Sequence, residues 1–361
     1  MTEINQKKLS EYRELAKKDL WDFKEPKASS IFQRMEAEGC SLNDWAFNPF
    51  GGMFRSPFTQ DLTNVDIACV GVSMENTVPE RTGQKFGPAA VRRWSHLMGP
   101  IHHITGTVPF DMCNIIDYGD VDLSKGFNVE DRIDCIYETF LKLTNHGITT
   151  LTIGGEHTIT YPILKAHART KPIGLIHLDA HGDTWGSVGG TEVNDASALR
   201  VAIKEGLIDP ERTIQLGLRG RSFHFWSYSF DVGTRVVTVE EFQEKGAAVL
   251  AKEARMIVGD EACYLTFDVD VLDPMHMPGT GLPEPFGLTT REVRDFIRGL
   301  RGLNLVGADI TELCPPADPT DMSANVVAGF CFEMLCLLSE AHVARTGKSS
   351  KTHWNNPSAA G

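Results

Sequence analysis

Residues 173–183 read IGLIHLDAHGD, an apolar run followed at once by Asp179, His181 and Asp183. A run that is apolar at nearly every position is typical of a strand buried on both faces of a parallel sheet. In such sheets, ligands bind beyond the carboxyl ends of the strands. We therefore expect a central strand, followed by a loop whose side chains belong to a functional site.

From residue 65 onward, short apolar runs alternate with longer helical patterns. This alternation predicts one α/β domain in which helices enclose a parallel sheet. The predicted strands are 65–73, 150–153, 173–178, 213–218, 235–239, 264–269 and 305–310. The predicted helices are 88–97, 129–145, 158–168, 196–205, 239–257, 290–300 and 324–345.

The first part of the chain has a different pattern. One polar helix is expected over 7–18, and scattered aromatic residues with intervening Pro and Gly follow it. Such a segment cannot bury a core of its own, so we expect an arm that packs on its own domain or on a neighbouring subunit. The expected division is an N-terminal extension at 1–60, an α/β domain at 61–350 and a C-terminal tail at 351–361.

Composition excludes several classes of protein. The chain of 361 residues has 35 Lys and Arg against 48 Asp and Glu, a net charge of −13 that disfavours nucleic acid as a partner. No apolar run has the length expected of a membrane span, and the N-terminus lacks the apolar core of a secretory signal. The eight cysteines show no C-x-x-C spacing and lie in apolar surroundings, which predicts reduced thiols in a cytoplasmic protein.

Two further predicted strands end in potential metal ligands. His157 follows one in the segment GGEHT at 154–158, and Asp268 and Asp270 end another in FDVD at 267–270. A single motif of this kind is compatible with a solvated turn, but three successive strand ends bring the carboxylates to one edge of the sheet. Their repulsion calls for divalent cations, and two ions fit the number of ligands better than one. Oxygen-rich ligation with imidazole suits Mn²⁺, Ni²⁺, Fe²⁺ or Co²⁺.

Three motifs over residues 65–345 resemble the ureohydrolases, the family of arginase, agmatinase and guanidinobutyrase. They are GGEHTIT at 154–160, DAHGD at 179–183 and FDVDVLDPMHMPGTGLPEP at 267–285. The resemblance implies an arginase-like three-layer α/β/α fold with a mostly parallel sheet, and a trimer or hexamer. It also implies two Ni²⁺ or Mn²⁺ ions, one held by His157, Asp179, Asp183 and Asp268, the other by His181, Asp179, Asp268 and Asp270.

The resemblance further implies hydrolysis of a guanidino carbon with release of urea. Asp183 is expected to move the proton from the attacking water to the leaving nitrogen, and Glu312 to bind the guanidinium. The other residues expected to contact substrate are Thr82, Trp185, Asn194 and Trp226. Thr82 carries a short hydroxyl in a loop expected to face the site, and the aromatic residues are expected to shorten the pocket.

Several substrates and functions remain open at this stage. The sequence after DAHGD lacks the polar residues that arginases carry, and 193–197 lacks the His-Gly pair of agmatinases. These departures favour guanidine or a small substituted guanidine or biguanide such as metformin, with an agmatinase or guanidinobutyrase activity as the alternative. A non-catalytic partner subunit and a one-zinc deacetylase of related fold are alternatives of other classes. All six metal-ligand positions are filled, which argues against both.

Overall fold

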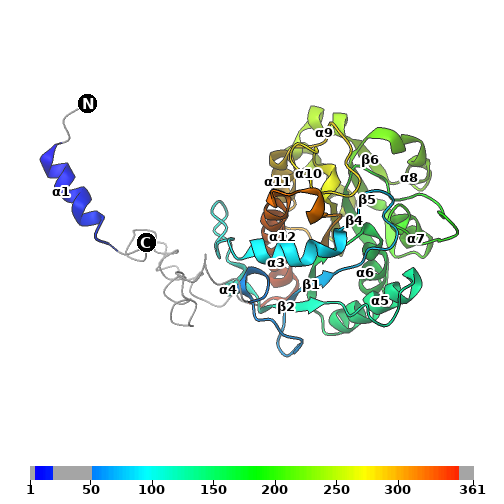
Figure 1. The fold of residues 1–361 in the computed structure, drawn as a ribbon, viewed down its shortest axis with the longest axis horizontal. Helices are drawn as coiled ribbons and strands as arrows, with labels where there is room; N and C mark the ends of the chain where they lie inside the picture. The colour runs from blue at the N-terminus through cyan, green and yellow to red at the C-terminus, as the bar shows by residue number, and fades with distance from the viewer. Residues whose placement is uncertain (1–4, 19–50, 349–361) are drawn as a thin grey trace. The chain divides into compact units, whose positions relative to one another are not determined.

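The seven predicted strands and one strand that was not predicted, β2, form one eight-stranded sheet. All neighbouring strands pair in parallel, in the order β2-β1-β3-β8-β7-β4-β5-β6 (Figure 1). The strands are β1 (Ile67–Val72), β2 (Ile115–Asp120), β3 (Thr149–Gly154), β4 (Ile173–Leu178), β5 (Ile208–Leu218), β6 (Arg235–Thr238), β7 (Cys263–Asp268) and β8 (Leu305–Thr311). This arrangement confirms the predicted parallel α/β fold.

The computed structural model describes residues 5–18 and 51–348. The chain divides into two compact units, Phe50–Lys348 and Met1–Pro49 with Ser349–Gly361. Met53 and Phe54 are buried in the core of the first of these, so the α/β unit begins before the expected boundary at residue 61. In the other unit, the predicted polar helix is confirmed as α1 (Gln6–Leu15), and the expected aromatic arm at 19–50 lies outside the described residues.

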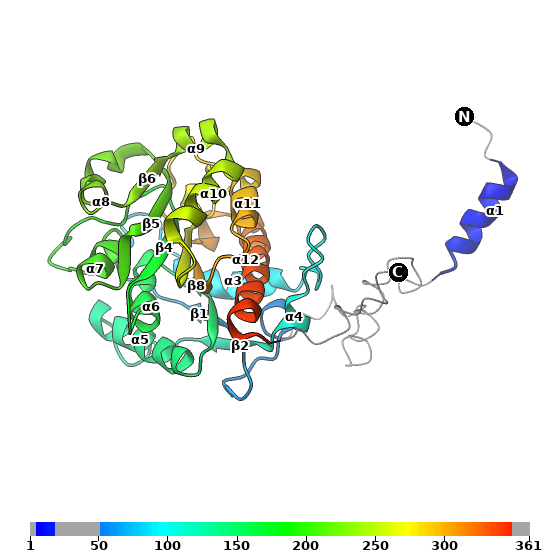
Figure 2. The ribbon, with the colours of Figure 1, turned by 180° about the vertical axis from the view of Figure 1, so that it is seen from behind.

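Helices cover both faces of the sheet, as expected for three layers (Figures 1 and 2). One face packs on α3 (Gly87–Ser95), α10 (Ala247–Val258), α11 (Thr290–Gly299) and α12 (Met322–Thr346). The other packs on α5 (Val129–Asn145), α6 (Thr160–His167) and α7 (Ala198–Lys204). Shorter helices are α4 (Pro109–Met112), α8 (Ser227–Asp231) and α9 (Val239–Lys245).

Side chains alternate between the two faces along each buried strand. In β1, Ile67 and Cys69 belong to the core on the α12 side, whereas Ala68 and Val70 belong to the core on the α5 side. This alternation follows from the two-residue period of a strand, and it explains why the runs are apolar throughout.

Two element predictions were wrong. Strand β2 was not predicted, because Asp117, Gly119 and Asp120 interrupt its apolar pattern. Asp117 is buried there, and the nearby Arg92 donates to it through Nε at 2.8 Å, which supplies the counter-charge. The helix predicted over 239–257 is two helices, α9 and α10, because Gly246 adopts φ +80° between them.

Helix α12 is long and apolar enough to cross a membrane by length and composition. However, 72% of its most apolar window is buried inside the structure, and it packs against β8 and α3. The apolar character of α12 therefore fits a core helix. The seven described cysteines are all buried and free, as predicted.

Candidate active site

Four adjacent central strands, β3, β8, β7 and β4, carry the predicted metal ligands and Glu312 at their carboxyl ends. His157 begins a 3-10 turn after β3, and Asp179 directly follows β4. Asp268 ends β7, and Asp270 lies in the turn Val269–Val271. Residues more than 100 positions apart in sequence thus meet because their strands are neighbours in the sheet.

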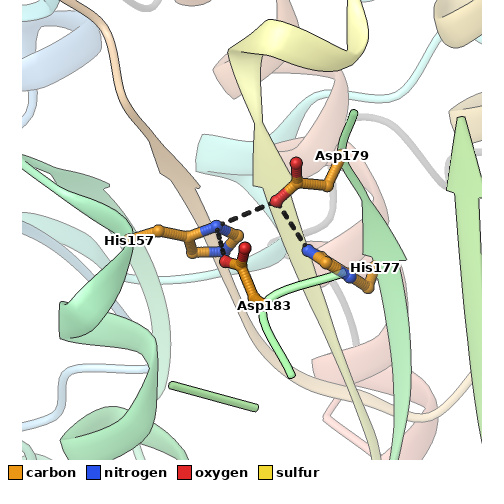
Figure 3. A group of neighbouring side chains, drawn as sticks. All are labelled: His157, His177, Asp179 and Asp183. Atoms are coloured by element: carbon orange, nitrogen blue, oxygen red, sulfur yellow. Dashed lines mark hydrogen bonds and ion pairs between the residues drawn. The ribbon is translucent and has the colours of Figure 1, made fainter. Parts of the chain in front are cut away.

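The first group of ligands surrounds the imidazole of His157 (Figure 3). Its Nδ1 lies 2.8 Å from Asp183 Oδ2, 3.1 Å from Asp179 Oδ2 and 3.3 Å from Asp268 Oδ2. All four side chains are buried. The structure therefore brings together the four residues that the resemblance assigned to one metal ion.

The second group surrounds His181. Its Nδ1 lies 2.9 Å from Asp270 Oδ2 and 3.4 Å from Asp179 Oδ1. The two oxygens of Asp179 therefore face different imidazoles, as a carboxylate shared by two cations would. Asp268 faces the first group through Oδ2, and its Oδ1 accepts a hydrogen bond from the backbone of Asp270, in the second group, at 2.8 Å.

Hydrogen bonds at Nε2 decide which nitrogen of His157 carries the proton. Its Nε2 lies 2.8 Å from Thr266 Oγ1, and that hydroxyl donates to Asp309 Oδ1 at 2.6 Å. Since the single Thr266 proton is used toward Asp309, Thr266 accepts from Nε2–H, and the other nitrogen faces the carboxylates. This is the arrangement that presents a histidine as a metal ligand.

The electrostatics of the cluster fit divalent cations. Burial raises the pKa of Asp268 well above its ordinary value, and the charges of Asp270 and Asp179 raise it further. Burial opposes protonation of His157, but Asp183 and the other carboxylates still raise the pKa of that imidazole. His157 Nδ1 and Asp183 Oδ2 face each other at 2.8 Å, both are buried, and the tautomer set by Thr266 leaves no proton between them. Cations between them would satisfy both atoms and offset the negative charge.

His177 belongs to the first group, although the sequence analysis did not select it. Its Nε2 lies 2.8 Å from Asp179 Oδ2 (Figure 3). Its Nδ1 lies 3.0 Å from Gln215 Nε2. His177 and Asp179 are two residues apart at the end of β4, so they point the same way. That spacing was the available signal, and we interpret His177 as a residue that orients Asp179.

Two site residues adopt a left-handed backbone conformation, Asp183 with φ +49° and Glu312 with φ +64°. This conformation costs a non-glycine residue about 1–3 kcal/mol and persists only where the surroundings impose it. The backbone of Asp183 is held by hydrogen bonds from α7: its carbonyl oxygen accepts from Leu199 N at 3.1 Å and from Arg200 N at 3.3 Å. For Glu312, the backbone N–H donates to Gly155 O at 2.9 Å.

The ligands border a cavity of about 340 Å³. Glu312 lines it, and both of its carboxylate oxygens have partners: Oε1 accepts from His157 N at 2.8 Å and Oε2 from Gln84 Nε2 at 3.1 Å. Three further acids outside the ligand set, Glu80, Asp195 and Glu284, also line the cavity. Its lining is therefore strongly acidic.

Aromatic rings form part of the cavity wall. Trp185 and Phe225 both line it, with ring centroids 3.9 Å apart and an interplanar angle of 55°. The structure thus places Trp185, an expected substrate contact, in the wall of the cavity. Phe225 was not selected as a site residue from the sequence.

Three of the expected substrate contacts lie outside the cavity lining. Thr82 is exposed. Asn194 is buried, and its side chain bonds the backbone of its own loop through Ala196 N and Thr191 O. Trp226 is buried and packs with Leu218 and Val236. A substrate contact is therefore not proposed for these three residues.

Comparison with known proteins agrees with this geometry. The model of the arginase family matches residues 65–336. A human mitochondrial guanidino acid hydrolase is 38% identical over 289 residues, covering 79% of this chain and 82% of that protein. A mitochondrial agmatinase of Gallus gallus is 39% identical over 289 residues, covering 79% and 85%. The structure of proclavaminate amidino hydrolase from Streptomyces clavuligerus superposes with a TM-score of 0.77 at 33% identity, covering 81% and 98%. The chain thus belongs to the arginase family and is a hydrolase of C–N bonds in amidino compounds that uses two divalent metal ions.

Proposed function

We propose that this chain releases urea from a small guanidino compound that carries no carboxylate, with guanidine or a small substituted guanidine or biguanide such as metformin as the favoured substrate. The observation that carries the proposal is the charge of the cavity. Among the described residues that line it, Arg221 is the one lysine or arginine, and its Nε lies 3.1 Å from Glu284 Oε1.

An acidic cavity selects a cationic substrate. The guanidinium group is a planar cation with several N–H donors, and a carboxylate accepts from two of them at once. Glu312 lies buried beside the first ligand group and presents such a carboxylate. A guanidino acid would place its own carboxylate among Glu80, Asp195 and Glu284, and like charges repel. The described lining offers that carboxylate no lysine or arginine other than Arg221, which pairs with Glu284.

The aromatic wall supports a compact substrate. Trp185 and Phe225 line the cavity, and an aromatic ring attracts a cation above its face by about 0.5–2 kcal/mol. The loop that carries Trp185 is tied to the segment just before α7, because Trp185 N donates to Ala196 O at 2.8 Å. The rings therefore limit the length of the substrate rather than its charge.

The proposed reaction assigns each residue a task. When bound, the two divalent cations supply Lewis acidity, which lowers the pKa of a water molecule toward neutrality. Glu312 holds the guanidino group and turns its carbon toward the ligand groups. Asp183 accepts a proton from the attacking water and returns it to the leaving nitrogen. The C–N bond then breaks to give urea and ammonia from guanidine, urea and an amine from a substituted guanidine, or urea and a substituted guanidine from a biguanide.

An agmatine-like substrate is the second candidate. Glu80 is exposed at the cavity and could bind the ammonium of a longer diamine-type substrate. The agmatinase of Gallus gallus, with 39% identity, favours the same candidate. Like the favoured substrates, this candidate carries no carboxylate.

Further features of the protein are proposed on less direct grounds. The metal ions are Mn²⁺ or Ni²⁺, since both accept a ligand set of carboxylates and imidazoles. The seven buried free thiols support a cytoplasmic location. Assembly as a trimer or hexamer, from one or two kinds of subunit, rests on the family resemblance.

A urea-release assay tests the proposal. Protein loaded separately with Mn²⁺ and with Ni²⁺ is offered guanidine, metformin, agmatine, 4-guanidinobutyrate and arginine. We expect kcat/KM to be highest for guanidine or metformin and lowest for the two acids. Agmatine as the best substrate would select the second candidate, and preferred hydrolysis of 4-guanidinobutyrate would contradict the proposal.

A further inference from the structure

Asp195 is a cavity-lining carboxylate that the proposed reaction leaves without a task. It lies between β4 and α7, and its Oδ1 accepts a hydrogen bond from Ala196 N at 3.0 Å. Among the described residues, no lysine or arginine forms an ion pair with Asp195; Arg221, the cation of the lining, pairs with Glu284. Within the described part of the chain, no ion pair therefore offsets the negative charge of Asp195, and the positive charge that acts on it is that of His157.

Hydrogen bonds hold Asp195 in a fixed position relative to the metal ligands. Asp195 N donates to Thr77 Oγ1 at 3.0 Å. Thr77 is in turn bound to Glu156, its N–H donating to Oε2 at 2.7 Å and its hydroxyl to Oε1 at 3.1 Å. Glu156 is fully buried and directly precedes His157. Asp195 is thus anchored through Thr77 to the segment that supplies a metal ligand, which is the rigidity that a binding residue needs.

The carboxylates of Asp195 and Glu312 border the same cavity. Both line the cavity, and each lies close enough to the other acids for their charges to interact. Burial raises the pKa of Asp195 to about 7, and the charges of Asp183 and Glu156 contribute. The charge of Asp195 also acts on Glu312, so the two carboxylates repel each other. A cation between the two carboxylates would relieve this repulsion.

A guanidino group needs more acceptors than Glu312 provides. An alkyl guanidinium carries five N–H donors. Both oxygens of Glu312 already accept one hydrogen bond from the protein, through His157 N and Gln84 Nε2. Donors left unpaired in a buried site lose binding free energy, so the pocket requires a second acceptor.

Building on the proposed function, we propose that Asp195 and Glu312 form a clamp of two carboxylates around the guanidino group, with Asp195 accepting from the nitrogens that Glu312 does not reach. The clamp recognises a planar cation with unsubstituted N–H groups. Urea is neutral, so it loses the charge attraction to both carboxylates once the C–N bond has broken. The clamp therefore favours substrate over product.

Steady-state kinetics of metal-loaded Asp195→Asn test the clamp. Asparagine keeps an acceptor for Ala196 N but removes the charge. Loss of a hydrogen bond to a charged group raises KM for guanidine by about 10- to 100-fold, whereas the inhibition constant of urea stays unchanged. Glu192→Gln is the matched control, because it removes a carboxylate from the same loop. The side chain of Glu192 is exposed, pairs with Lys204 and lies outside the cavity lining.

The outcomes are separable. An unchanged KM for guanidine overturns the clamp. An increase in the inhibition constant of urea as large as the increase in KM for guanidine overturns it too. Loss of metal content or of thermal stability with unchanged substrate affinity would make Asp195 a structural residue. If Asp195→Asn does not fold, Asp195→Ser replaces it, since the hydroxyl can accept from Ala196 N. If wild type hydrolyses no guanidino compound, the proposed function fails, and calorimetric binding of guanidinium chloride to wild type and variant still tests the clamp.

Discussion

At the scale of single residues, Asp179 organises the metal centre. One of its oxygens faces His157 and the other faces His181, so its carboxylate links the two ligand groups. The strand end that carries it was recognisable from the sequence, because an apolar run preceded D-x-H-x-D. His177 and Asp195 were not recognised, because a single histidine in a strand and a single aspartate in a loop most often have structural roles.

Replacing a ligand should abolish both metal binding and activity. Asp268 lies 3.3 Å from His157 Nδ1 and is buried among the other ligands. We expect Asp268→Ala to lower kcat by at least about 1,000-fold, equivalent to about 4 kcal/mol of lost transition-state stabilisation. Asp260→Ala is the control, since Asp260 is exposed just before β7. Metal analysis and urea release measure the effect, and full turnover by Asp268→Ala would refute the ligand assignment.

Removing an aromatic ring should change selectivity. Trp185 packs against Phe225 in the cavity wall, so Trp185→Ala enlarges the cavity at that point. We expect kcat/KM for longer guanidino compounds such as agmatine to rise relative to that for guanidine. The comparison variant is Phe223→Ala, whose ring is 65% exposed and lies outside the lining. A substrate profile of Trp185→Ala identical to that of wild type would exclude Trp185 as a limit on substrate length.

At the scale of elements, four neighbouring strand ends create the site. The runs of β3, β4, β7 and β8 were apolar enough to be predicted, but the sequence did not show that β3 lies beside β8 and β7 beside β4. This order depends on long-range packing of helices on both faces. The polar strand β2 shows the same limit, because Asp117 is acceptable in a buried strand only when Arg92 reaches it.

Strand β4 positions ligands through its two-residue period. His177 holds Asp179 from behind, and partners of this kind affect metal affinity by about 10- to 100-fold. We expect His177→Phe, which keeps the packing volume, to weaken metal binding by this factor while the fold persists. His146→Phe serves as the control, because His146 is exposed at the end of α5. Unaltered metal affinity in a titration of His177→Phe would exclude the positioning role.

Helix α11 permits a test of stability that is separate from the site. Thr289 and Glu292 form a reciprocal capping box at its N-terminus, with Thr289 N donating to Glu292 Oε2 at 2.8 Å. We expect Thr289→Ala to lower the free energy of unfolding by about 1 kcal/mol without changing KM. Denaturant unfolding measures the change, for which Thr290→Ala is the control at the neighbouring position. Equal stability of wild type and Thr289→Ala would contradict the capping assignment.

At the scale of the whole molecule, metal binding and folding are linked. In the metal-free protein, the pKa of His157 and of His181 is raised well above the ordinary value, against the effect of burial, by the carboxylates around them. Their protonation stabilises the metal-free fold below the unfolded pKa, and this stabilisation is lost as the pH rises through the folded pKa. Cations must displace these protons, so metal affinity increases with pH.

Metal removal should therefore lower the melting temperature by an amount that depends on pH. A free cation concentration of 100 times Kd stabilises the folded state by about 2.7 kcal/mol. We expect the difference in Tm between metal-loaded and chelated protein to grow as the pH is raised from 6 toward 8, in about the range where histidines and bound ions exchange protons. Calorimetry at several pH values measures it. A difference that shrinks with rising pH would contradict the linkage.

The central claim is that carboxyl ends of β3, β4 and β7 hold two divalent cations side by side. The most direct test is the metal content of the purified chain after incubation with Mn²⁺ or Ni²⁺ and removal of unbound metal. The account predicts about two ions per chain, as expected for a paired site that activates water. One ion per chain, or none in a folded protein, would contradict it.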